Sequence, residues 1–231
     1  MSFEVSPKSI NNVRRHKERA SYDHESVHKA LDDSLVCHVG FCVEDPEGDP
    51  EPIPVVIPMV YGRKDNVLYL HGYVSGRLVK HLAQGKRVSI TTTEVNGLVL
   101  ALSAFHHSVN YRSCCVFGRG ELVDDPEEKI EALKVITNHL VKGRWDQCRE
   151  STKVELQTTK VVKVVIESAS VKQSYRDEPE EDKNDYKNEA LCQSIWTGIV
   201  PMKTVYGTPI PSSINKQPLP DNIRALGEHT Q

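Results

Sequence analysis

The sequence has no long apolar run, few aromatic residues and no excess of positive charge. None of its apolar stretches approaches the roughly 20 residues that a membrane-spanning helix needs, and residues 1–12 contain no apolar signal-peptide core. The formal net charge is -3, whereas nucleic-acid-binding proteins usually carry a strong basic excess. We therefore expect a cytoplasmic protein that binds neither a membrane nor a nucleic acid.

The six cysteines also lack the spacing of a metal or redox site. None of them forms a C-x-x-C pair, so the sequence indicates neither zinc nor a redox disulfide. The separated histidines His38, His71 and His106 share no metal-ligand spacing with one another. We expect no metal site, and free, mostly buried thiols.

Residues 67–77 have the pattern of a strand, a small polar turn and the start of a helix. An alternating apolar run ends at His71-Gly72, and a helical apolar pattern begins after Arg77. The first N–H groups of a helix have no internal partner and lie at the positive end of its dipole, so they favour anions. Arg77 adds a planar guanidinium that matches a phosphate. We interpret this stretch as the phosphate-binding part of a nucleotide cofactor site, with a surface salt bridge as the alternative role of Arg77.

Strand-length apolar runs alternate with turn signals along the chain. The Asn96-Gly97 dipeptide predicts a hairpin turn, and Leu98–Ala104 predicts either a strand or a buried helical turn. Hairpin connections with helices inserted at the edges favour a small antiparallel barrel, mainly β, over alternating βαβ units. Strands are expected over residues 35–43, 53–61, 67–72, 87–94, 110–123 and 160–166, and helices from Ser21 or Asp23 to Ser34, from Arg77 to Gly85 and from Pro126 to Gly143.

Composition divides the chain into four parts. Residues 1–12 are expected to be a disordered leader, and residues 13–175 to form the barrel. Residues 176–190 are charged and poor in apolar side chains, which predicts a surface linker. Residues 191–231 are expected to form a proline-rich, extended arm that packs on the barrel or on a partner.

Several motifs in register resemble the pyridoxamine 5'-phosphate oxidase-related FMN-binding split-barrel family, which also includes nitroimidazole-resistance reductases. They are LYLHGYVSGRLVKHL (68–82), HVGF (38–41), VIPMVYGR (56–63), NGLVLALSAFHHSVNYRSCCVFG (96–118) and EKIEAL (128–133). This resemblance implies a homodimer of six-stranded antiparallel split β-barrels that binds FMN at the subunit interface.

The resemblance also implies which residues bind FMN. The phosphate would contact the turn after the 67–72 strand, the 58–61 segment would run along the flavin, and residues 112 and 113 would reach its ring. An aromatic residue in the arm would lie beside the flavin, although it is equally typical of a core anchor. The expected cofactor-binding set is Pro58, Met59, Val60, Tyr61, His71, Gly72, Ser75, Gly76, Arg77, Arg112, Ser113 and Trp196.

Two departures from the family pattern bear on activity. After Trp196-Thr197-Gly198 the chain continues with Ile199-Val200-Pro201, where the true oxidases have an arginine-histidine-arginine cluster for the substrate phosphate. Leu102 stands where the bacterial relatives have an arginine. Vitamin B6 oxidation is therefore not expected.

The resemblance implies an FMN-dependent oxidoreductase that acts on a small molecule such as a nitro compound, a quinone or a pyridoxal-like compound. His71 is the candidate proton donor or substrate contact, and its alternative role is a hydrogen bond that fixes the turn. Two other functions stay open: a flavin-binding or sensing module without turnover, and a haem-binding split barrel.

Arg77→Ala tests the phosphate assignment. If the guanidinium makes a charge-assisted contact with the phosphate, the substitution weakens FMN binding by about 1–3 kcal/mol. The affinity can be measured by titrating the flavin-free protein with FMN. An unchanged dissociation constant would remove Arg77 from the phosphate site.

Overall fold

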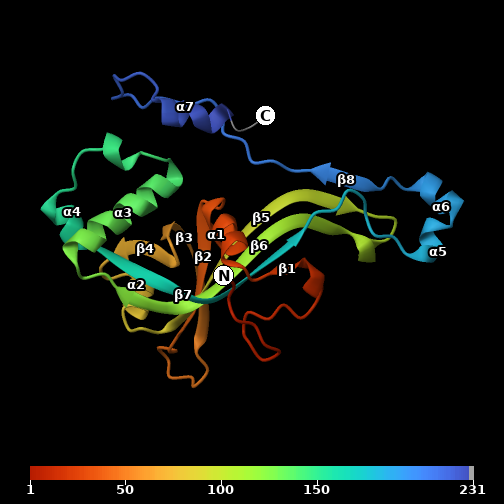
Figure 1. Ribbon diagram of the computed structural model, residues 1–231, viewed down its shortest axis with the longest axis horizontal. Coiled ribbons are helices and arrows are strands. Elements are labelled where there is room, and N and C mark those ends of the chain that lie inside the picture. Colours follow the sequence, from red (N-terminus) through yellow and green to blue (C-terminus); the bar gives the residue numbers. More distant parts are fainter. Residues whose placement is uncertain (229–231) are drawn as a thin grey trace.

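Six antiparallel strands close into a ring in the computed structural model, which describes residues 1–228 (Figure 1). The order is β7-β4-β3-β2-β5-β6, and β6 pairs back with β7. The predicted six-stranded split barrel is thereby confirmed. The ring strands are β2 (Val36–Val43), β3 (Ile53–Lys64), β4 (Val67–Tyr73), β5 (Arg87–Leu100), β6 (Ser108–Leu122) and β7 (Thr159–Ser174), while β1 (Ala20–Ser21) adds to β7 and β8 (Gly198–Pro201) adds to β5.

Helices lie on the outside of the ring and along the C-terminal arm (Figure 1). No helix within residues 1–228 is long and apolar enough to cross a membrane. The helices are η1 (Lys17–Arg19), α1 (His24–Asp32), α2 (Arg77–Leu82), η2 (Ala104–His106), α3 (Pro126–Leu140), η3 (Trp145–Gln147), α4 (Lys153–Thr158), α5 (Lys183–Tyr186), α6 (Glu189–Ser194) and α7 (Asp221–Glu228).

The barrel wall separates two apolar layers. Successive side chains of a strand point to opposite faces, and on β4 the buried Leu68 and Leu70 belong to the core inside the barrel. Tyr69, between them, packs in a second cluster with Ala132 and Ile136 of α3. Side chains at odd-numbered positions of β4 therefore face α3, not the barrel interior.

The ring splits between β3 and β4. From Ile53 to Val60, β3 pairs with β2, but it pairs with β4 only from Tyr61 to Lys64. Beyond that point the two strands diverge, and β4 continues alongside β7 alone up to Tyr73. One edge of β3 is thus unpaired over the part that contains Pro54 and Pro58, as expected for residues that have no N–H group to donate.

The helices α1 and α3 begin where the sequence predicts, because each has an aspartate as its N-terminal cap. The Asp23 side chain accepts a hydrogen bond of 2.8 Å from the Ser26 N–H at the start of α1. Asp125 accepts one of 2.7 Å from the Glu128 N–H at the start of α3, with proline at the first position. Gly143, with a φ of 76°, lies just beyond the end of α3.

One predicted turn is wrong, and a second is shorter than predicted. Asn96-Gly97 is a bulge and not a hairpin turn, because β5 continues to Leu100 and the register with β6 shifts between Val95 and Gly97. A Cβ at Gly97 would lie 3.1 Å from the Val200 carbonyl oxygen, so glycine here permits the close approach of β8. The predicted turn at residues 62–66 is shorter, with β3 running to Lys64 and Asp65 adopting a φ of 52°.

The predicted disordered leader is packed against the barrel. Phe3 is only 8% exposed, and Asn11 is 2% exposed. The Asn11 side-chain amide donates hydrogen bonds to the carbonyls of Glu4 (3.2 Å) and Ala169 (3.0 Å). Burial of an apolar ring and a bonded amide fixes this segment, which composition alone had indicated to be free.

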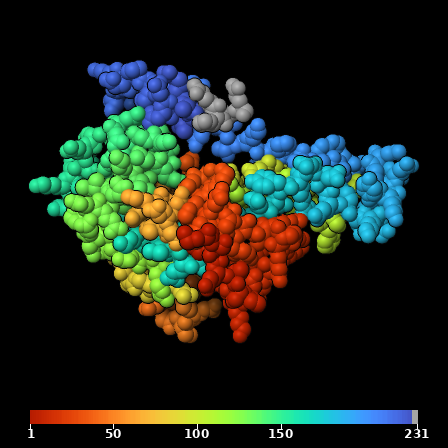
Figure 2. Space-filling model, in the orientation of Figure 1, coloured from red at the N-terminus to blue at the C-terminus, as the bar shows by residue number. Residues whose placement is uncertain are grey.

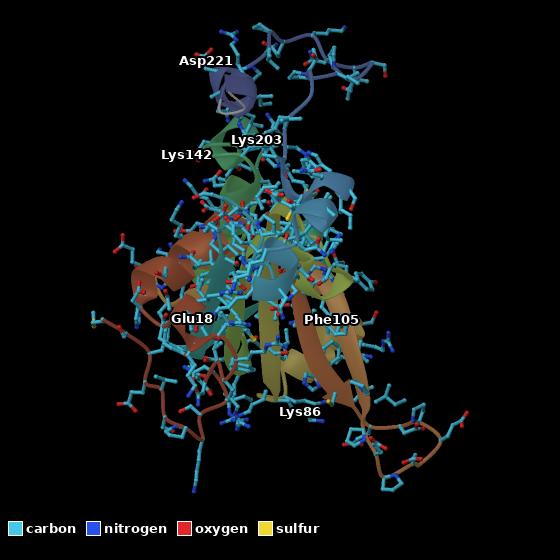
Figure 3. The ribbon with its side chains drawn as sticks, turned by 90° about the vertical axis from the view of Figure 1, so that its right-hand side faces the viewer. Glu18, Lys86, Phe105, Lys142, Lys203 and Asp221 are labelled. Carbon is cyan, nitrogen blue, oxygen red and sulfur yellow. The ribbon has the colours of Figure 1, made fainter. Side chains whose placement is uncertain are left out.

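The predicted linker and arm also contain helices. The charged segment includes α5 and α6, and the arm ends in α7, which lies above the α3–η3 region in Figures 1 and 3. Asn222 of α7 donates to the Lys142 carbonyl (2.9 Å) and accepts from the Gln147 amide (3.1 Å). Residues 229–231 of the predicted arm lie outside the described residues.

Gly62→Ala is expected to destabilise the protein. A Cβ at Gly62 would lie 2.8 Å from the Ile136 amide nitrogen, so α3 or β3 must shift. Overpacking of this kind costs about 1–3 kcal/mol, or roughly 2–4 °C in Tm for each kcal/mol in a chain of this size. Gly207→Ala is the control, because nothing lies within 4 Å of a Cβ there. Equal melting temperatures for the two variants would contradict the close α3–β3 contact.

Candidate functional site

The turn between β4 and α2 has the shape that the sequence predicts. The Gly76 N–H donates a 2.9 Å hydrogen bond to the Tyr73 carbonyl, and Gly76 is the N-terminal cap of α2. Ser75 and Arg77 are exposed, and neither side chain makes a hydrogen bond or ion pair with the described residues. The Arg77 guanidinium is therefore available to an anion at this turn.

Both glycines of the turn are required by close packing. A Cβ at Gly72 would lie 2.9 Å from Val79 of α2, and one at Gly76 would lie 3.1 Å from the Tyr73 carbonyl oxygen. Their small size brings α2 against β4. Residues 72–77, the predicted phosphate turn, are therefore positioned by contacts among themselves and with the start of α2.

The β3 segment predicted to run along the flavin borders the split, but its residues differ in accessibility. Pro58 is exposed, and Met59 and Val60 are half-buried. Tyr61 is fully buried, and its hydroxyl donates to the Leu31 carbonyl. Burial raises the pKa of Tyr61 far above its ordinary value. The Tyr61 side chain is therefore not available to a ligand in the split, and its main chain pairs with Leu70 of β4.

Arg112 is held in an ion cluster on the β5–β6 side of the barrel. Its side chain is 12% exposed and donates to Glu94 (2.6 Å) and Asp33 (2.5 Å). Burial disfavours its charge, but the hydrogen bonds to Asp33 and Glu94 outweigh that effect and raise its pKa. The Ser113 hydroxyl donates to the Lys172 carbonyl (3.3 Å). These bonds use Nε and Nη2 of Arg112, so a flavin contact would have to come from Nη1 or displace a carboxylate.

Trp196 lies on the C-terminal arm and is 66% exposed. Its ring covers Gly198, where an added Cβ would lie 3.0 Å from the indole. The Ile199–Pro201 segment, which replaces the substrate-phosphate cluster of the true oxidases, pairs as β8 with β5. Within one chain the predicted residues therefore form three separate groups: the β3–β4 opening, the β6 ion cluster and the arm.

His71 faces the helical layer, on the opposite side of β4 from the barrel core. It lines a cavity of about 210 Å³ together with residues of α3, η3 and α4. Its Nδ1 atom is buried and has no hydrogen-bond partner among the described residues. The cavity wall also includes Leu133, Ile136, Thr137, Trp145, Ser151, Glu155, Leu156 and Thr159.

The surroundings of His71 keep its imidazole neutral and leave Nδ1 without a hydrogen bond to the described residues. Burial lowers the pKa of His71, and no nearby carboxylate opposes that shift. The one acid in the cavity wall, Glu155, is bound by Arg149 at 2.6 Å and caps α4 through Thr152, which lowers its pKa to about 2. A neutral imidazole in a cavity lined by both apolar and polar side chains can hydrogen-bond to a ligand or coordinate the metal of a cofactor.

One metal-type spacing was missed by the sequence reasoning. His24-Glu25-Ser26-Val27-His28 has the H-E-x-x-H pattern of zinc sites and lies on α1. In the structure the His24 ring stacks on Phe3 with centroids 4.2 Å apart and contacts His28 edge-on. Within the described part of the chain, no group of three potential ligands is close enough to hold a metal ion. The pattern therefore has a packing role on α1.

Comparison with known proteins identifies similar structures over nearly the whole chain. The family model described as pyridoxamine 5'-phosphate oxidase matches residues 23–173. Flavocytochrome Anf3 from Azotobacter vinelandii is 30% identical with a TM-score of 0.84, over 96% of this chain and 98% of its own. The FAD and heme binding protein from Mycobacterium smegmatis is 28% identical with a TM-score of 0.79, over 90% and 97%. Among curated protein sequences, none matches.

A third similar structure covers less of the chain. It is a candidate 5-nitroimidazole antibiotic resistance protein from Bacteroides thetaiotaomicron, 27% identical with a TM-score of 0.53. It matches 66% of this chain and 85% of its own. The two fuller matches extend beyond residue 173, where the family model ends.

The buried state of His71 predicts a pH dependence of stability. Its pKa is below the ordinary 6.5 in the folded protein, so between the two values the unfolded chain binds more protons. Stability is therefore lost as the pH falls below about 6.5 until the folded pKa is passed. Denaturant unfolding of ligand-free protein between pH 7.5 and 5 should show a shallower pH slope for His71→Asn than for wild type.

His28 and His81 contribute in the same direction, because burial lowers the pKa of each. The His71→Asn variant should consequently keep part of the slope. His107→Asn, at an exposed position, is the matched control. Parallel pH profiles for wild type and His71→Asn would show that His71 is not titrating in this way.

Proposed function

Because the chain belongs to the pyridoxamine 5'-phosphate oxidase family, as its sequence motifs predicted, we propose that it is an oxidoreductase that binds both a flavin and a haem. The observation that supports the haem is the buried His71 Nδ1, which has no hydrogen-bond partner among the described residues and lies in a cavity with Leu133, Ile136 and Trp145 in its wall. Two similar proteins, matched over 96% and 90% of this chain, are named a flavocytochrome and an FAD and heme binding protein. Haem binding, which the sequence left open as an alternative to flavin binding, is here proposed in addition to it.

The residues around His71 fit a haem chemically. Neutral imidazole is a common axial ligand of haem iron, and a lowered pKa keeps the imidazole neutral. Leu133, Ile136 and Trp145 supply apolar contacts for a macrocycle. The cavity of 210 Å³ is smaller than the roughly 300–1,000 Å³ of most ligand sites, so a haem requires the short η3 and α4 segment to lie further out.

The β3–β4 opening fits the flavin. Arg77 has a free guanidinium beside the first turn of α2, and the exposed Pro58 edge of β3 borders the same opening. The sequence predicted FMN; the name of the M. smegmatis protein favours FAD, and we propose FAD with FMN as the alternative. Either nucleotide presents a phosphate that Arg77 can bind.

The two groups suggest the type of reaction. A bound flavin exchanges electrons in pairs or singly and a haem exchanges them singly, so a protein with both can connect a two-electron donor to a one-electron acceptor. The role of the chain would be to bind the flavin and the haem and to keep them apart. His71 and Arg77 belong to adjacent parts of β4 and α2, but the His71 side chain faces α3. His71 would therefore hold a haem, and Arg77 a flavin, on different faces of the wall near the same end of β4.

We also propose that the protein is a homodimer whose arm packs on the partner. The arm exposes many large apolar side chains, and apolar surface of this extent marks an interaction site. Phe105 at the end of the β5–β6 hairpin is 99% exposed as well. The exposed apolar residues of the arm are Ile195, Trp196, Val200, Met202, Val205, Tyr206, Ile210, Ile214 and Leu219.

The absorbance spectrum of the purified protein tests the proposed function. We expect flavin bands together with a haem Soret band, and release of FAD on denaturation. His71→Ala should abolish the Soret band and keep the flavin, whereas His38→Ala, at an exposed position of β2, should keep both. Light scattering on the same sample should give twice the 26.0 kDa chain mass.

Other outcomes distinguish the alternatives. Flavin bands without a Soret band, even after haem is added, would favour the flavin-only oxidoreductase or sensing module. Haem retained in His71→Ala would remove His71 as the ligand. A colourless protein that takes up neither cofactor would overturn the proposal.

A further inference from the structure

A second cavity lies at the opposite end of β7 from the cofactor opening. It measures about 490 Å³ and is formed by η1, β1, the end of β7 and the segment that follows it. Figure 2 shows the N-terminal segment and the segment after β7 side by side on one face, and Figure 3 labels Glu18 at the surface of η1. Two arginines, Arg19 and Arg176, line this cavity.

Arg176 is held rigidly and has unused donors. The buried side chain of Asn110 binds its main chain twice, accepting from the Arg176 N–H at 2.9 Å and donating to its carbonyl at 2.8 Å. The Arg176 side chain is only 14% exposed, and its Nε is buried without a hydrogen-bond partner among the described residues. A buried guanidinium N–H without an acceptor is unfavourable, so an acceptor is expected at this position.

Among residues 1–228, one side chain, that of Glu180, forms an ion pair with both arginines. Glu180 lies 3.4 Å from Arg19 Nη2 and 3.4 Å from Arg176 Nη2, distances that are long for charge-assisted hydrogen bonds. Glu180 is 66% exposed, whereas the Arg19 and Arg176 side chains are 18% and 14% exposed. The Glu180 carboxylate is therefore the most solvent-accessible of the three charged groups, and an anion that binds both arginines would compete with it.

The donors and walls define the class of ligand. Two guanidinium groups present N–H donors in planar forks, a geometry that suits the oxygens of a phosphate, although the Arg176 Nε is buried and Glu18 and Glu180 already contact other donors. The remaining wall includes Ser21, Gln173 and Tyr175, which can hydrogen-bond to hydroxyl groups, and a second acid, Glu18, whose carboxylate lies 3.6 Å from Arg19 Nε. A volume of 490 Å³ is within the roughly 300–1,000 Å³ of small-molecule sites, and exceeds what a single phosphate needs.

We propose that this cavity binds a small phosphomonoester with a hydroxyl-bearing body, such as a sugar phosphate. Arg19 and Arg176 bind the phosphate, and the phosphate displaces Glu180. Ser21 and Gln173 contact the hydroxyl groups of the body. The site is independent of the flavin and haem sites proposed above.

Calorimetric titration of the full chain as purified, in phosphate-free buffer at low salt, tests the proposal with ribose 5-phosphate and inorganic phosphate as probes. We expect ribose 5-phosphate to bind, and more tightly than inorganic phosphate. Arg176→Gln should weaken its binding by about 10- to 100-fold, because charged hydrogen bonds are lost. Glu180→Gln should strengthen binding, because a competing carboxylate is removed.

Arg87→Gln is the matched control, since Arg87 is 67% exposed and lies outside the cavity. It should leave the affinity unchanged, and Arg176→Gln should keep its flavin absorbance. If Arg176→Gln fails to fold, Arg19→Gln serves the same test. The proposal is overturned if wild type gives no binding heat, if Arg87→Gln weakens binding equally, if Glu180→Gln weakens it, or if the arginine variant loses flavin.

Discussion

Pairing of β7 along both of its edges is the constraint on which the rest of the structure depends. One edge pairs with β6 from Val162 to Ser174, and the other pairs with β4 from Thr159 to Val165 and then with β1. This closes the ring and fixes His71 opposite Val161, facing the helical layer. The strand spans 16 residues, or about 50 Å along its path at roughly 3.3 Å per residue. The β3–β4 opening therefore lies at one end of β7, and the cavity lined by Arg19 and Arg176 lies at the other.

Most of the barrel is encoded by local patterns that the sequence displays. The apolar runs, the caps at Asp23 and Asp125 and the helix ends near Gly85 and Gly143 all lie close to where they were expected. The errors occurred where distant partners decide the structure. Asn96-Gly97 is a strong turn signal, but pairing of β8 with β5 keeps the strand going. The part of β7 beyond Ile166 is polar, and its pairing with β6 was invisible to periodicity.

The candidate site was predictable in part for the same reason. The strand, turn and helix around Gly72, Gly76 and Arg77 are local, so this unit could be recognised from its order in the chain, while its phosphate role stays a prediction. The cavity beside His71 is built from α3, η3 and α4, which begin 55 or more residues after it and have no motif of their own.

Two arginines show why sequence patterns cannot predict contacts between residues that are far apart in the chain. The hydrogen bonding of the Arg112 side chain depends on Asp33, 79 positions away in the sequence. Arg176 lies in a segment whose composition indicates a solvated linker, yet the contact with Asn110, 66 positions earlier, holds it against the barrel. Composition describes the average exposure of a segment and cannot identify the one side chain that a distant partner buries.

The unpaired edge of β3 has a consequence for the solution behaviour of the protein. An open strand edge is a template on which other polypeptides can add by main-chain hydrogen bonding, and such addition leads to aggregation. Pro54 and Pro58 remove two of the N–H donors from this part of β3, and their rings obstruct an incoming strand. The barrel can therefore stay open to a small ligand while remaining closed to extended peptides.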